Sequence, residues 1–144
     1  MSDNIVTSEN RNDISRYKMR EQAFILCFEM LFSDADPDEL ADNAGDARDE
    51  FLSDYAVACA KGVKEHQEEI DAMISDKLKS GWKITRISKV SLALLRLAVY
   101  EMLYRDDIPV SVSINEAVEL SKKYTVEEDT SFINGVLGSV AKAL

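Results

Sequence analysis

Residues 87–137 read ISKVSLALLRLAVYEMLYRDDIPVSVSINEAVELSKKYTVEEDTSFINGVL, and they decide the fold. They predict three consecutive helices with polar joints, and the first, Ser88–Tyr104, carries apolar residues on almost every face. A helix that is apolar all round must be surrounded by other helices or by lipid. A membrane span needs about 20 apolar residues, whereas this helix contains Lys89, Arg96 and Glu101. We therefore expect it to be the buried centre of an all-α bundle.

Helical spacing of apolar residues and helix-start signals predict the remaining helices. Ser15 is a plausible N-cap for the first helix, and Asp36 followed by Pro37 is typical of a second helix start. Gly62 ends or bends the third helix, and Gly81 is the expected left-handed stop of the fourth. We expect helices over 15–32, 36–45, 46–61, 63–80 and 88–104, with one more capped by Ser111 and a last one beginning at Asp129 or Thr130. The sequence thus predicts a bundle of about seven helices.

Length and composition indicate one globular domain, with 144 residues and an apolar fraction of 46%. We expect residues 15–144 to form this domain and the polar, aperiodic residues 1–14 to form a mobile tail. The N-terminus lacks the basic start and apolar core of a secretory signal. Cys27 and Cys59 lie in apolar helical stretches, where two reduced core thiols are typical of an intracellular chain. The expected location is therefore the cytoplasm, without a membrane segment.

The formal net charge of −10 is unevenly distributed along the chain. Residues 34–50 hold eight acids against one arginine, whereas residues 11–20 hold four cations against one acid. At physiological salt, charges more than about 8 Å apart are largely screened. A local basic cluster can therefore bind phosphates although the whole chain is acidic.

Few residues have the character that catalysis or metal binding needs. His66 is the only histidine and lies in a charged run, which is typical of a solvated surface. A zinc site needs several Cys or His ligands at defined spacing, and one histidine with two distant cysteines does not supply them. The phosphate-loop motifs GxxxxGK[ST] and GxGxxG are missing from the sequence. We expect no enzyme activity, no metal and no cofactor.

Five motifs, in matching order and spacing, resemble the NusB family of bacterial transcription antitermination factors. They are RxxxREQAF at 16–24, WKITRISKV at 82–90, LRLAVYEML at 95–103, IPVSVSINEAVEL at 108–120 and FINGVL at 132–137. The resemblance implies an all-helical RNA-binding domain that pairs with the small-subunit ribosomal protein NusE. It also implies binding of boxA, a single-stranded element of ribosomal RNA transcripts, within an antitermination complex that keeps RNA polymerase elongating.

The resemblance places RNA at the start of the first helix, where Arg16, Lys18 and Arg20 would contact phosphates. Arg16 and Arg20 are one turn apart and share a face, although Arg20 could instead pair with an acid across the bundle. A second contact is implied at the start of the last helix. There Phe132 would meet the RNA and Glu128 would moderate affinity by repelling phosphates. The residues alone leave two other readings open: the basic turn also suits an ordinary solvated helix end, and Phe132 also fits the core.

Two positions are implied to meet the ribosomal protein. Phe28 stands where the family has an aromatic residue against that partner, although it also fits the core. Ser91 stands where many relatives have a carboxylate on the partner's side, so one ion pair across the interface would be lost. The acidic surface leaves a rival hypothesis open, a purely protein-binding helical module without direct RNA contact. Both a monomer and a homodimer remain open for the free protein.

Overall fold

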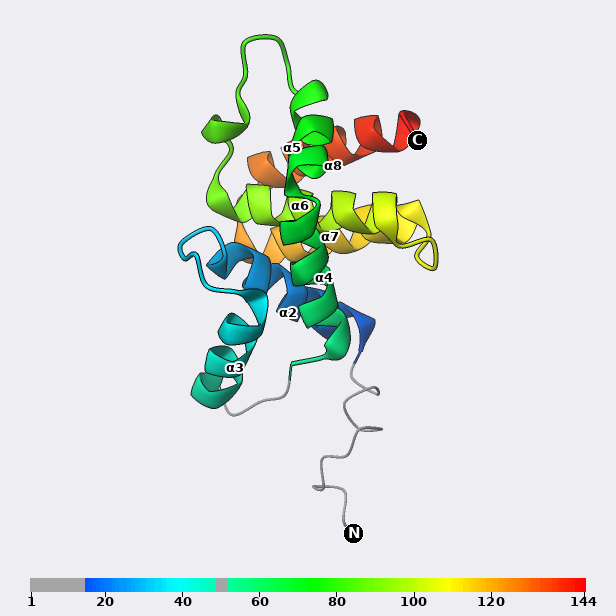
Figure 1. Cartoon of the computed structure of the whole chain (residues 1–144). Coiled ribbons are helices and arrows are strands. Elements are labelled where there is room, and N and C mark those ends of the chain that lie inside the picture. The colour runs from blue at the N-terminus through cyan, green and yellow to red at the C-terminus, as the bar shows by residue number, and fades with distance from the viewer. Residues whose placement is uncertain (1–14, 49–51) are drawn as a thin grey trace.

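The computed structural model describes residues 15–48 and 52–144, and the regular elements of this part of the chain are all helices (Figure 1). The predicted tail, residues 1–14, lies outside the described residues. The seven α-helices of the described part are α2 Arg16–Glu29, α3 Pro37–Arg48, α4 Asp54–Glu65, α5 Gln67–Asp76, α6 Lys89–Tyr104, α7 Val110–Tyr124 and α8 Glu127–Lys142. A short 3-10 helix, η1 Ile84–Arg86, precedes α6. The predicted all-α bundle of about seven helices is confirmed.

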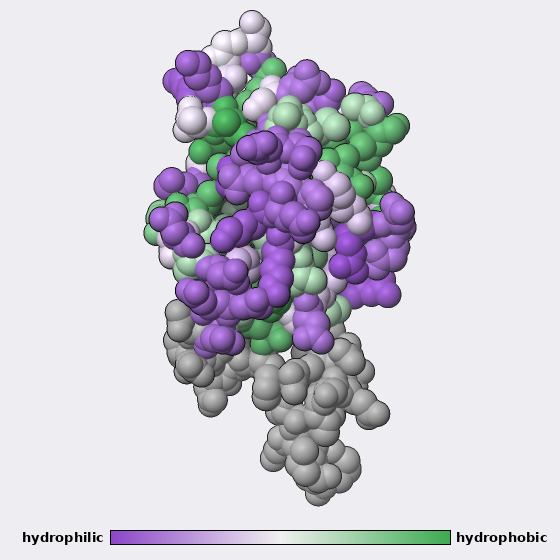
Figure 2. Space-filling model, in the orientation of Figure 1, coloured by the Kyte–Doolittle hydropathy of each residue, from purple (hydrophilic) through white to green (hydrophobic). Residues whose placement is uncertain are grey.

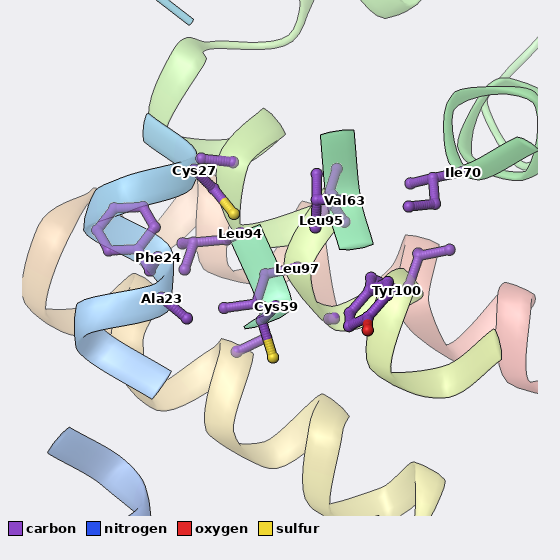
Figure 3. Close-up of a cluster of buried hydrophobic side chains, with 14 of the residues drawn as sticks. Ala23, Phe24, Cys27, Cys59, Val63, Ile70, Leu94, Leu95, Leu97 and Tyr100 are labelled. Carbon is purple, nitrogen blue, oxygen red and sulfur yellow. The ribbon is translucent and has the colours of Figure 1, made fainter. Parts of the chain in front are cut away.

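Helix α6 is the centre of the bundle and contacts α2, α4, α5, α7 and α8. Leu94, Leu95 and Val99 are at most 1% exposed. Figure 3 shows Leu94 and Leu95 in one cluster with Phe24 of α2 and Val63 of α4. Hydrophilic side chains cover the front of α4 and α5 in the view of Figure 2. The all-round apolar character of α6 therefore reflects burial among helices.

Three predicted helix starts are confirmed by their caps. The hydroxyl of Ser15 accepts a hydrogen bond from the Lys18 amide at 3.1 Å, and Ser88 caps α6 in the same way. The carboxylate of Asp36 accepts from the Asp38 amide at 2.8 Å, just before α3. Side-chain oxygens of this kind satisfy amides that the helix itself leaves without a partner.

Two predicted helix starts are wrong by a short distance. Helix α7 begins at Val110, directly after Pro109, and Ser111 lies inside it. Proline fixes a φ near −65°, which suits a helix start, and here the Pro109 φ is −60°. Helix α8 begins at Glu127, where three consecutive acids occupy the first turn. Carboxylates there are stabilised by the positive end of the helix dipole.

The division between α4 and α5 differs from the prediction. Ser53 caps α4, and the two helices are separated at His66, so Gly62 lies inside α4 rather than at a boundary. A Cβ atom at Gly62 would lie 2.2 Å from Cε1 of Tyr100, so glycine lets α4 and α6 approach closely. Gly81 has a φ of +86°, as expected, but it lies in the connection after α5 has ended at Asp76.

Cys27 and Cys59 are free and buried, which confirms the predicted core thiols. Burial raises the pKa of both thiols, that of Cys59 to about 12, so both are protonated at neutral pH. Among residues 15–48 and 52–144, no helix is long and apolar enough to cross a membrane.

Replacing Leu95 by alanine should lower the free energy of unfolding by about 2–5 kcal/mol, because its buried side chain would leave a cavity. Leu144→Ala is the matched control, since Leu144 is 56% exposed and should change stability by less than about 0.5 kcal/mol. Urea denaturation of the two variants measures both effects. Equal midpoints would show that α6 is not the centre of the core.

Candidate nucleic-acid interface

Arg20 is buried, so the expectation that it is an exposed member of the basic turn is wrong. Its Nε donates to Oε2 of Glu101 at 3.0 Å, and its Nη1 lies 3.6 Å from Oε1 of Glu116. The Tyr55 hydroxyl donates to the same Glu101 oxygen. Arg20 therefore pairs with an acid across the bundle, which was the alternative left open by the sequence. The pairing follows from burial, because a buried carboxylate needs a charged partner.

The other two predicted cations lie at the surface. Arg16 is exposed at the first position of α2. The Lys18 side chain is 45% exposed, and its Nζ lies 3.4 Å from Oε1 of Glu21. Arg16 and Lys18 are thus the two cations that the basic turn presents to solvent.

Glu21 links a third cation to this turn, which sequence reasoning missed. Its buried carboxylate accepts hydrogen bonds from Lys123 Nζ at 2.5 Å and from the Tyr124 hydroxyl at 2.7 Å. Burial acts to raise the Glu21 pKa, but Lys123, Tyr124 and Lys18 together outweigh it and lower that pKa below its ordinary value. The Lys123 side chain remains 54% exposed. Lys18 and Lys123 therefore lie together at Glu21, and with Arg16, two residues before Lys18 on α2, they are here called the α2 basic cluster.

A cavity of about 200 Å³ opens beside the α2 basic cluster. Its lining residues are Arg16, Met19, Arg20, Tyr55, Arg105, Asp107, Ile108, Pro109 and Val112. Arg105 donates to both carboxylate oxygens of Asp107, at 3.1 and 3.2 Å, and these bonds lower the Asp107 pKa. The N-terminus of α7 adds a partial positive charge to the same wall. Arg20 and Arg105 are paired with carboxylates, so Arg16 and the N-terminus of α7 are the groups of this wall that remain to attract a phosphate.

The two predicted contacts on α8 lie near its start. Glu128 is exposed in the first turn, so its carboxylate is available to repel phosphates. Phe132 is half-buried, and its ring centroid lies 6.0 Å from that of Trp82. Phe132 therefore packs partly against the core and is partly accessible to solvent. Its position is compatible with a core role and with an RNA contact.

The two predicted partner residues differ in accessibility. Phe28 is half-buried in a row of rings that begins on α2 and ends at Phe32, just after that helix. Its ring centroid lies 6.2 Å from that of Phe24 and 5.0 Å from that of Phe32. Phe32 is 61% exposed and carries Lys89 over its ring. Ser91 is only 1% exposed, so its side chain is covered by the protein's own helices, and its contact with a partner stays a prediction. Serine is small enough to be covered by neighbouring helices, whereas a lone carboxylate there would be costly to bury.

An all-helical bundle with cations gathered at one helix start suits the binding of a polyanion. The NusB family model matches residues 17–142, and this chain belongs to the NusB family. The transcription antitermination protein NusB of Acetivibrio thermocellus is 48% identical over 131 residues, which cover 90% of each chain. The solved structure of T. maritima NusB superposes with a TM-score of 0.76 at 35% identity, covering 90% of this chain and 92% of that one. A chain in a crystal structure of antitermination factors NusB and NusE in complex with dsRNA superposes with a TM-score of 0.79 at 29% identity. The match covers 91% of this chain and 100% of that one.

Arg20→Ala should lower the free energy of unfolding by about 3–5 kcal/mol, because it leaves Glu101 buried without its cation. Lys18→Ala, two residues earlier on the same helix, should change it by less than about 0.5 kcal/mol. Chemical denaturation monitored by circular dichroism compares the two. A similar small change in both variants would show that the buried pair does not hold α2 against α6.

Proposed function

We propose that this chain is a transcription antitermination factor that pairs with the small-subunit ribosomal protein NusE and binds boxA RNA. It acts in the cytoplasm by assembly rather than catalysis, and keeps RNA polymerase elongating on ribosomal RNA genes. The observation that carries the proposal is the family match over residues 17–142. A relative of the same fold has been solved with NusE and dsRNA, which supports NusE and RNA as partners.

The α2 basic cluster is the proposed phosphate contact within a helical RNA-binding domain, residues 15–144. Two of its cations, Lys18 and Lys123, share the carboxylate of Glu21, so one of the three positive charges of the cluster is offset. With a net charge of −10 on the whole chain, binding of RNA by this protein alone should be weak. A basic partner would extend the positive surface and supply the additional positive charge that RNA binding needs.

The proposed contact surface for NusE is the exposed end of this row of rings, just after α2. Phe32 and the accessible part of Phe28 offer an aromatic contact, and Lys89 lies beside it. Aromatic residues are enriched where protein interfaces form. The acidic surface also favours the second candidate function, a module that binds protein without touching RNA.

Adding NusE should tighten binding of labelled boxA RNA by at least about tenfold, or about 1.4 kcal/mol, because the pair presents a joint positive surface. Fluorescence anisotropy with and without the partner measures this, and a scrambled RNA of equal length is the control. Binding of NusE with no gain in RNA affinity would favour the purely protein-binding module.

Arg16→Ala should make the plot of log affinity against log salt shallower by about 0.7, the contribution of one phosphate contact on a single strand. Lys142→Ala, which removes an exposed cation at the far end of α8, should leave that slope unchanged. Both measurements use the complex with NusE between low and physiological salt. An unchanged slope in folded Arg16→Ala would remove this residue from the RNA site.

A further inference from the structure

The hydroxyl of Ser113, on α7, is a polar group that the fold places inside the bundle. Ser113 is 1% exposed, and among residues 15–48 and 52–144 its Oγ has no hydrogen-bond partner. A hydroxyl buried in this way costs stability, because its hydrogen bonds to bulk water are lost and not replaced. Most buried polar atoms therefore bond either to protein or to an ordered water. The surroundings of Oγ indicate which of the two applies to Ser113.

A cavity of about 10 Å³ lies beside Ser113 and is here called the Ser113 cavity. Three of its lining residues are polar, Arg20, Glu101 and Ser113, and the others are leucine or alanine. Each lining residue is at most 5% exposed, so α2, α6 and α7 close the cavity off from solvent. A buried water needs about 10–15 Å³ and two to four polar partners. The Ser113 cavity therefore has room for one water molecule and for no larger ligand.

The polar residues of the Ser113 cavity supply both donors and acceptors. The Glu101 carboxylate accepts from Arg20 Nε at 3.0 Å and from the Tyr55 hydroxyl, and both bonds end at Oε2. A carboxylate has several acceptor sites and a guanidinium several donors, so both groups can bond a further molecule. The Ser113 hydroxyl both donates and accepts. A water in this position can thus be held by an anion, a cation and a hydroxyl at the same time.

We propose that the Ser113 cavity binds one ordered water, which donates to the Glu101 carboxylate, accepts from the Arg20 guanidinium and bonds the Ser113 hydroxyl. Buried waters typically make about three hydrogen bonds, to groups that would otherwise lack a partner. The proposed site meets this requirement with one residue from each of three helices. The inference is independent of the proposed function.

The proposed water gives α7 a polar link to the buried pair between α2 and α6. Without it, Ser113 faces that pair across the cavity and makes no bond to it. The residue before it, Val112, lines the larger cavity beside Arg16 together with Pro109. A water that fixes Ser113 therefore also positions the wall that α7 contributes beside the α2 basic cluster.

A crystal structure of the full chain, at a resolution that shows ordered water, tests the site directly. We expect density for one water within hydrogen-bond distance of Ser113 Oγ, the Glu101 carboxylate and the Arg20 guanidinium. A serine inside a helix can also turn its hydroxyl to the carbonyl four residues earlier, which here belongs to Pro109. Ser113 Oγ bonded to that carbonyl, beside a cavity without density, would overturn the inference.

Ser113→Ala tests in solution whether the hydroxyl takes part in the network. It removes one of the three bonds to the water, so the melting temperature should fall by about 3 °C. Ser91→Ala is the matched control, because Ser91 is also 1% exposed and its Oγ also lacks a partner within 15–48 and 52–144, but Ser91 does not line the cavity. Removing a hydroxyl that bonds nothing should leave the melting temperature unchanged or raise it.

The difference between the two variants is the decisive quantity, because alanine has the higher helix propensity at both positions. Calorimetry or circular dichroism of both variants and of the wild type measures it. A melting temperature of Ser113→Ala below that of Ser91→Ala, together with the water density, supports the site. Equal melting temperatures of the two variants, at or above that of the wild type, would overturn the inference.

Discussion

Glu101 lies in the most buried helix of the bundle, where a carboxylate is tolerated only if other helices supply its partners. Arg20 of α2 and Tyr55 of α4 both donate to it, so the charge joins three helices at one point. A buried pair of this kind adds little net stability over an apolar pair, but losing one member is costly. It therefore selects the arrangement in which α2, α4 and α6 meet correctly. This arrangement also determines where the exposed side chains of α2 lie.

The sequence pattern predicted those features of the fold that depend on apolar burial and on local helix caps. The all-round apolar character of Ser88–Tyr104 identified the central helix, and Ser15 and Asp36 marked helix starts because their side chains bond amides two or three residues away. The break at His66 was not predictable in this way. Gly62 looked like a boundary, whereas it is required by the approach of Tyr100 from a distant helix.

The site depended on tertiary contacts that no sequence pattern carries. Arg16, Lys18 and Arg20 look alike as a basic run, yet only the fold decides that Arg20 faces Glu101 while the other two face solvent. The partnership of Glu21 with Lys123 joins residues 102 positions apart. The family motifs gave the region of the interface, and the geometry decided which of its side chains are available.

Arg20 and Glu21 are consecutive residues of opposite charge, and both are buried. On a helix of 3.6 residues per turn they project about 100° apart, one to Glu101 of α6 and the other to Lys123 and Tyr124 of α7. Two anchors at different angles leave α2 no freedom to rotate about its axis or to slide along it. A rotation or a shift of α2 would separate Arg20 or Glu21 from its partners and move a charge into apolar surroundings. The directions of Arg16 and Lys18 are thereby set before any ligand arrives, so less conformational entropy is lost when a phosphate backbone docks.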